Sequence, residues 1–173
     1  MQLPWAFRGD IVHMDCLKSL PVTPFAMAIG ELTGGLVLLA AIQVVILIGL
    51  LGAGGNPALI LTVMAFFVPF DLLLLAMSNT LFLIYPVRLS QGTSADFQMV
   101  GRKMLFILMQ FLILIPALGI PAGFAALAYV LSGFNLSVFA VTAWVLLAAE
   151  VPLWLFLLAS MFVRFDPGTE TPP

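Results

Sequence analysis

Long runs of apolar residues, separated by short polar stretches, dominate this chain. Four runs are long enough to cross a bilayer, because a helix rises about 1.5 Å per residue and the apolar core of a bilayer is about 30 Å thick. They cover residues 25–51, 58–85, 104–131 and 138–163. Strands of a membrane barrel would alternate polar and apolar positions, whereas these runs are apolar on every face. The pattern predicts an all-α polytopic membrane protein with about four membrane-spanning helices.

Composition supports the same fold class. Of the 173 residues, 63% are hydrophobic and only 8% are charged, against about 25% charged in soluble domains. The lipid bilayer is therefore the first expected partner. Only six residues are basic, so we expect no nucleic-acid partner. The single cysteine, Cys16, excludes an internal disulfide and a cysteine-based zinc cluster.

The basic residues indicate how the chain sits in the membrane. In a four-span topology, all of them fall on one side: Arg8, Lys18, Arg88, Arg102, Lys103 and Arg164. Segments rich in Lys and Arg stay in the cytoplasm. We therefore expect a multi-pass protein of the cell (inner) membrane with both termini cytoplasmic. The predicted parts are a cytoplasmic segment over 1–24, a transmembrane domain over 25–164 and a short cytoplasmic tail over 165–173.

The segment 10–20 has the spacing of a short N-terminal amphipathic helix. Its apolar positions recur every three residues, at Ile11, Met14, Leu17 and Leu20. Its polar positions are Asp10, His13, Asp15, Lys18 and Ser19. Pro21 and Pro24 end it, because proline lacks a backbone N–H and clashes with the preceding turn. Two interpretations stay open: a helix lying at the lipid headgroups, or a helix that docks a cytoplasmic partner.

Two carboxyl groups lie near the middle of their spans, Asp71 and Glu150. An ionised carboxylate there costs about 2.5 to 3.5 kcal/mol on insertion scales, so neither should face lipid. Each has a proline two residues away, Pro69 and Pro152, which frees the carbonyl four residues before it. The freed carbonyls are those of Ala65 and Ala148, to which a protonated carboxyl could donate. The acids serve either a proton relay or substrate path, or they hold helices together in neutral form.

Other polar and small residues of the spans have structural interpretations. Glu31 lies about one turn inside its span, so we expect a solvated charge at a helix end. Gly30 and Gly34, and again Gly119 and Gly123, have the spacing that lets helices approach closely. We expect these four glycines to mark helix-packing faces. The amides are expected to form interhelical hydrogen bonds; they are Gln43, Asn79 and Gln110.

Common catalytic and metal-binding motifs are missing from the chain. His13 is the only histidine and precedes the spans, which excludes a paired-histidine zinc site and a triad base within the bilayer. A phosphate-binding loop of the Walker A type is also absent from the sequence. We therefore expect no catalytic residue, no metal and no cofactor. If ATP drives this protein, another polypeptide binds it.

Two stretches resemble bacterial ABC exporter permeases of the type-2 ABC-transporter class. The first reads FRGDIVHMDCLKSLPVTP over residues 7–24 and leads directly into a span; the second covers NTLFLIYPVR (79–88) and ADFQMVGRK (95–103). In that class a short coupling helix follows the second of six spans. The resemblance implies that residues 10, 11, 13, 14, 15, 17 and 18 contact a separate ATPase subunit.

The resemblance covers about a fifth of the chain and implies the C-terminal part of such a permease. The two spans that precede the coupling helix in the family have no counterpart here, so a second membrane half or a second copy is expected. The predicted function is the permease component of an ABC exporter, not an enzyme. The alternatives are a small proton-coupled exporter, a non-transporting membrane assembly subunit and an intramembrane enzyme.

Overall fold

The computed structural model describes residues 14–85 and 97–166 and is built from helices. In these two stretches there is no strand. A short helix, α1 (Met14–Ser19), precedes four long ones: α2 (Pro24–Gly52), α3 (Pro57–Ile84), α4 (Phe97–Leu131) and α5 (Leu136–Arg164). Each long helix contains a span long and apolar enough to cross a membrane, which in α4 is Met104–Leu131. The predicted all-α, multi-pass fold is confirmed, and every predicted span boundary lies within two residues of the observed one.

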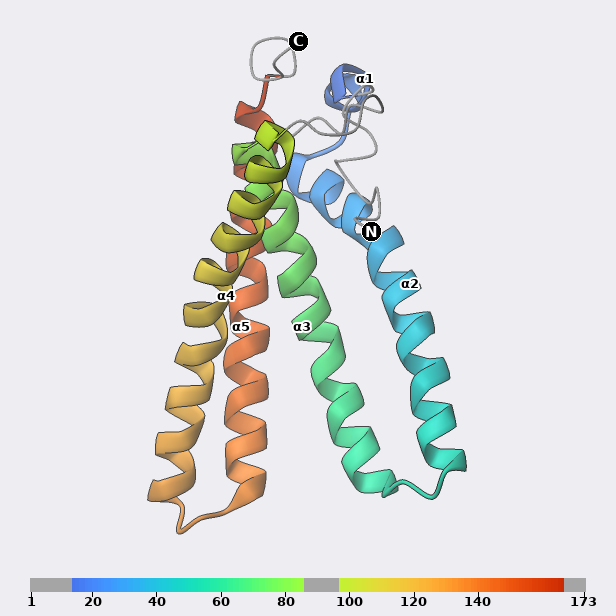
Figure 1. The fold of residues 1–173 in the computed structure, drawn as a ribbon, viewed down its shortest axis with the longest axis vertical. Coiled ribbons are helices and arrows are strands. Elements are labelled where there is room, and N and C mark those ends of the chain that lie inside the picture. The colour runs from blue at the N-terminus through green and yellow to red at the C-terminus, as the bar shows by residue number, and fades with distance from the viewer. Residues whose placement is uncertain (1–13, 86–96, 167–173) are drawn as a thin grey trace.

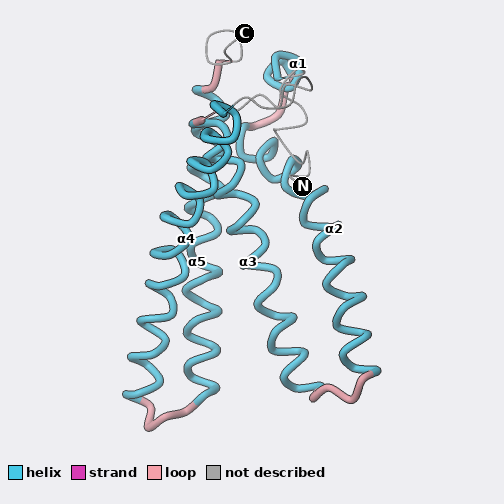
Figure 2. Tube along the Cα trace, in the orientation of Figure 1, coloured by secondary structure: helices cyan, strands magenta, loops and turns pink. Residues whose placement is uncertain are grey.

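The four long helices form two antiparallel hairpins, α2 with α3 and α4 with α5 (Figure 1). Both connecting turns lie at one end of the molecule, and α1 lies at the other, together with the described end of the chain at residue 166 (Figures 1 and 2). We call the first the loop end and the second the termini end. The hairpins meet at the termini end and diverge toward the loop end (Figure 1). The second and fourth long helices, α3 and α5, therefore run parallel.

Both hairpin turns use the same local chemistry. Each contains a glycine with positive φ, Gly54 at 84° and Gly133 at 73°, a conformation that costs glycine little because it has no Cβ. Each turn then ends on an asparagine N-cap. The Asn56 side chain accepts from the amide of Ala58, and the Asn135 side chain accepts from the amide of Ser137, both at 3.0 Å. These caps fix where α3 and α5 begin.

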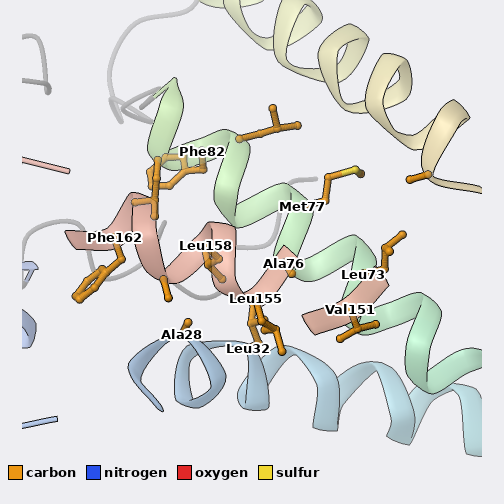
Figure 3. Close-up of a cluster of buried hydrophobic side chains, with 14 of the residues drawn as sticks. Ala28, Leu32, Leu73, Ala76, Met77, Phe82, Val151, Leu155, Leu158 and Phe162 are labelled. Carbon is orange, nitrogen blue, oxygen red and sulfur yellow. The ribbon is translucent and has the colours of Figure 1, made fainter. Parts of the chain in front are cut away.

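The buried core lies mainly in the half of the bundle nearer the termini end. Helix α5 contacts each of the other three long helices, and its apolar residues fill the centre of the cluster (Figure 3). Neighbouring side chains come chiefly from α3, with smaller shares from α2 and α4. Fully buried members of the cluster include Ala28, Leu73, Ala76, Met77 and Leu158. Helix α5 is therefore the main element through which the two hairpins are joined.

Candidate functional site

Asp71 is the better buried of the two mid-span acids. Its side chain is 4% exposed, and the Gln43 side-chain amide donates to Asp71 Oδ2 at 2.7 Å. Gln43 belongs to α2 and Asp71 to α3, so this bond connects the helices of the first hairpin. The prediction that Asp71 faces away from lipid is confirmed, and so is the interhelical role of Gln43. A hydrogen bond of this kind offsets part of the cost of burying a carboxyl group.

The carbonyl that Pro69 frees accepts a hydrogen bond from a residue that sequence reasoning missed. Trp144 Nε1 in α5 donates to the Ala65 carbonyl oxygen in α3 at 2.8 Å. The sequence suggested that a protonated carboxyl could donate to this carbonyl; in the structure the described hydrogen bond of Asp71 is the one from Gln43. A tryptophan N–H inside an apolar span is itself a sequence signal, because it needs an acceptor. What the sequence does not show is that α5 places this tryptophan opposite the freed carbonyl.

The second acid, Glu150, lies at about the same depth as Asp71. The Trp144–Ala65 contact sets the register of two parallel helices, and each acid lies six residues further along its own helix. Six residues advance any α-helix by the same distance, about 9 Å. Glu150 is half-buried, and within the described part of the chain its Oε2 is buried without a hydrogen-bond partner. Chemically, both groups can hold a proton at mid-depth.

The remaining intramembrane amides behave differently from each other. Gln110 in α4 donates to Ser78 Oγ in α3 at 2.9 Å, which joins the two hairpins as predicted for this residue. Asn79 instead donates to the Leu75 carbonyl of its own helix at 2.9 Å. Its Oδ1 is buried and has no hydrogen-bond partner in the parts of the chain that the structure describes. Asn79 therefore does not make the interhelical bond that its position suggested.

The four glycines predicted to mark packing faces do not pack against another helix in the described part of the chain. Beyond its chain neighbours and the adjoining backbone of its own helix, a Cβ built at Gly30, Gly34, Gly119 or Gly123 would meet no described atom within 4 Å. The small residues of α2 that are buried are Ala28 and Gly35. Packing of the four glycines against a second copy or another membrane half stays a prediction. Glu31 is half-buried about two turns into α2, and its role as a solvated charge at a helix end stays a prediction.

Helix α1 is attached to the end of α5 through Lys18. The Lys18 ammonium donates to the backbone carbonyl of Phe165, the residue that caps α5, and lies 5.9 Å from the centre of the Phe162 ring. Both contacts are favourable, because a helix C-terminus carries partial negative charge and an aromatic face attracts cations. Leu17 packs against the apolar core. One face of α1 is therefore occupied by the chain itself.

Of the other residues predicted to contact an ATPase, some lie in α1 and some lie outside the described residues. Met14 and Asp15 form the first turn of α1, whereas Asp10, Ile11 and His13 lie outside the described residues. Cys16 is exposed. The prediction of a short helix here is confirmed over Met14–Ser19. In the described ranges, no group of three or more His, Cys, Asp and Glu side chains could hold a metal ion.

Comparison with known proteins adds no family. No protein-family model matches the chain, and the searches of curated proteins and of solved structures found no match. The geometry described above is therefore the basis for any functional assignment. It defines the class as an all-α, multi-pass membrane protein with two helical hairpins joined at one end.

Proposed function

We propose that this chain is the membrane-spanning permease component of an exporter of the ABC type, driven by a separate ATP-binding subunit. The observation that carries the proposal is the attachment of α1 to the end of α5 through Lys18. Helix α5 contacts each of the other long helices, so a displacement of α1 would reach both hairpins. Coupling of a cytoplasmic motor to a membrane bundle needs such a stiff connection. A second membrane half or a second copy would complete the transporter.

The proposal includes an orientation in which the termini end faces the cytoplasm. Lys18 and Arg164 both lie at this end, at the last turns of α1 and α5. Basic residues flanking spans favour the cytoplasmic side. The exposed apolar residues beside α1 are then available to a cytoplasmic protein, since Leu20 and Val22 are each 48% exposed. These two side chains, and not the core-packed Leu17, are the expected contacts.

Cys16 provides the test, because it is exposed and is the only cysteine in the chain. A photoactivatable crosslinker attached to Cys16 in membranes of the native cell should capture a protein with a P-loop ATPase domain. The purified pair should hydrolyse ATP. Leu20→Asp should reduce capture at least several-fold, because a charge at the centre of an apolar contact is costly. Membrane insertion of this variant should be unchanged.

The matched control moves the crosslinker to the loop end. Asn56→Cys in a Cys16→Ser background should capture no ATPase and should react with an impermeant thiol reagent from outside intact cells. An ATPase that crosslinks at Arg164→Cys but never at Cys16 would overturn the coupling role of α1. Labelling of Asn56→Cys only after permeabilisation would overturn the orientation. Transport by the purified chain alone, driven by a pH gradient, would favour a proton-coupled exporter, for which Asp71 and Glu150 at equal depth are the supporting observation.

A further inference from the structure

The parts of helix α3 before and after Pro69 differ in how deeply their side chains are buried. From Pro69 to Leu83 most residues of the helix are buried, including Asp71 and Met77. Between residues 57 and 68 the only buried residue is Ile60. The missing N–H of Pro69 also removes one backbone hydrogen bond at the boundary, and proline is a common cause of helix bending. The first half of α3 is therefore attached more weakly than the second.

Among the described residues, Phe66 of this weakly attached half packs on the apolar core, and one hydrogen bond connects the half to α5. The Ala65 carbonyl, which Pro69 leaves without its intrahelical donor, accepts from Trp144 Nε1 at 2.8 Å. Trp144 is 40% exposed and comes from the loop-end part of α5, where the two hairpins diverge (Figure 1). The same proline thus supplies both a flexible point and the acceptor that holds the flexible segment in place.

We propose that residues 57–68 form a gate that moves about Pro69, and that the hydrogen bond from Trp144 to Ala65 holds this gate closed. Opening breaks that bond and moves the first half of α3 away from α5 at the loop end. The anchored half from Pro69 onward stays in place. The use of this gate in export rests on the proposed function, in which α1 receives the input at the opposite end. The gate itself is a property of the chain alone.

Distance measurements between spin labels test the gate in lipid nanodiscs, without ATP or a partner. One pair, Leu61→Cys and Val141→Cys, reports on the gate; both side chains are more than 60% exposed. A second pair, Ile84→Cys and Val163→Cys, reports on the anchored end. Both pairs are placed in a Cys16→Ser background. Trp144→Phe should raise the ratio of open to closed molecules about threefold at the first pair, the size expected for an average interhelical hydrogen bond in a membrane.

Three controls make the test decisive. Trp154→Phe changes a tryptophan of the same helix that packs on the core and should not open the gate. Pro69→Ala restores an N–H that can bond to Ala65, so it should suppress opening in the Trp144→Phe background. If Trp144→Phe folds poorly, 3-benzothienylalanine at position 144 keeps a bicyclic ring of similar shape and removes the N–H donor without adding a group that would push Ala65 away.

An unchanged distance distribution at the first pair overturns the gate, as does an equal change at both pairs. Failure of Pro69→Ala to suppress opening overturns the role of Pro69. These outcomes are independent of crosslinking at Cys16. If the spin labels show that α3 does not move, the coupling proposal is unaffected. If crosslinking at Cys16 captures no ATPase, the gate proposal is unaffected.

Discussion

The two halves of the bundle are both strongly apolar in sequence but differ in how they pack. In the half nearer the termini end, Leu73 and Leu158 are fully buried, and α5 fits against α2 and α3 (Figure 3). In the half nearer the loop end, Leu59 and Leu61 of α3 are 64% and 66% exposed. Every one of the four spans has a mean hydropathy above 2. Hydropathy therefore explains why the helices enter the membrane but not where they associate.

The difference follows from what drives helix association in lipid. Lipid tails are as apolar as leucine side chains, so burial alone does not bring helices together there. Close approach of small residues and interhelical hydrogen bonds do. The packed half contains Ala28, Ala76 and Ala159 among its buried residues, and Ser78, two residues after Ala76, joins the hairpins through its bond with Gln110. In the loop-end half, the Trp144–Ala65 bond joins α3 to α5.

The largest expected effect contrasts one leucine from each half. Leu158→Ala removes a fully buried side chain from the centre of the cluster and should reduce the free energy of unfolding by about 2 to 4 kcal/mol. Leu61→Ala, on the exposed face of α3, should change it by less than about 0.5 kcal/mol. Unfolding by sodium dodecyl sulfate in mixed micelles, followed by tryptophan fluorescence, measures both. Equal losses would remove the distinction between the two halves.

Most of the fold could be predicted because a bilayer leaves few choices. Backbone groups must be satisfied inside each span, so an apolar run of sufficient length becomes a helix. The turns were equally readable, since Asn56 precedes Pro57 and Asn135 follows Gly133, the residues expected at helix starts and tight turns. What no periodicity could predict was the association of the helices, because the spans are apolar all round and give no single buried stripe.

The candidate site was predicted only in part, for a related reason. Asp71 stood out because an isolated acid in a span must find a partner, and its partner Gln43 was already expected to bond between helices. Trp144 and Lys18 were underestimated. The contact of Trp144 can be predicted only when the register of α3 against α5 is known. The contact of Lys18 can be predicted only when it is known that the end of α5 lies beside α1. Both are long-range contacts, which depend on how the hairpins meet.

The next prediction concerns the two acids at the boundary between the halves. Asp71→Asn keeps an acceptor for Gln43 and should leave stability almost unchanged. Asp71→Leu leaves the buried Gln43 amide without its partner and should cost about 1 to 2 kcal/mol. Glu150→Gln and Glu150→Leu should cost less, because Glu150 Oε2 has no partner among the described residues. The same unfolding assay measures all four variants.

A double substitution separates the energy of the Gln43–Asp71 hydrogen bond from the effect of replacing each buried side chain on its own. If the Gln43–Asp71 bond accounts for the loss, Gln43→Leu combined with Asp71→Leu should cost less than the sum of the two single changes. If the loss of stability in the double variant equals the sum of the two single losses, the hydrogen bond does not contribute to stability. A larger loss from Glu150→Leu than from Asp71→Leu would show that Glu150 has a structural partner outside the described residues or in another subunit.

The smallest effects on stability are expected at the glycines that face outward, two on α2 and two on α4. Beyond its chain neighbours and the adjoining backbone of its own helix, a Cβ at Gly30 or Gly119 would meet no described atom within 4 Å. Alanine there should therefore change the free energy of unfolding by at most about 1 kcal/mol, the helix-propensity difference. Gly55→Ala is the matched control. Its Cβ would lie 2.8 Å from the Leu50 carbonyl oxygen, so it should destabilise the first hairpin turn.

Isoleucine at the same outward positions tests whether another membrane subunit covers them. Gly119→Ile adds a branched side chain to a face that is open within this chain, so folding of the monomer should be preserved. If a second copy packs there through close backbone approach, the substitution should weaken self-association, measured by energy transfer between labelled copies in lipid, by tenfold or more. Gly30→Ile applies the same test to α2, near the better packed end. Loss at Gly119 but not at Gly30 would place the interface on the second hairpin, and unchanged association at both would show that these glycines are not packing faces between copies.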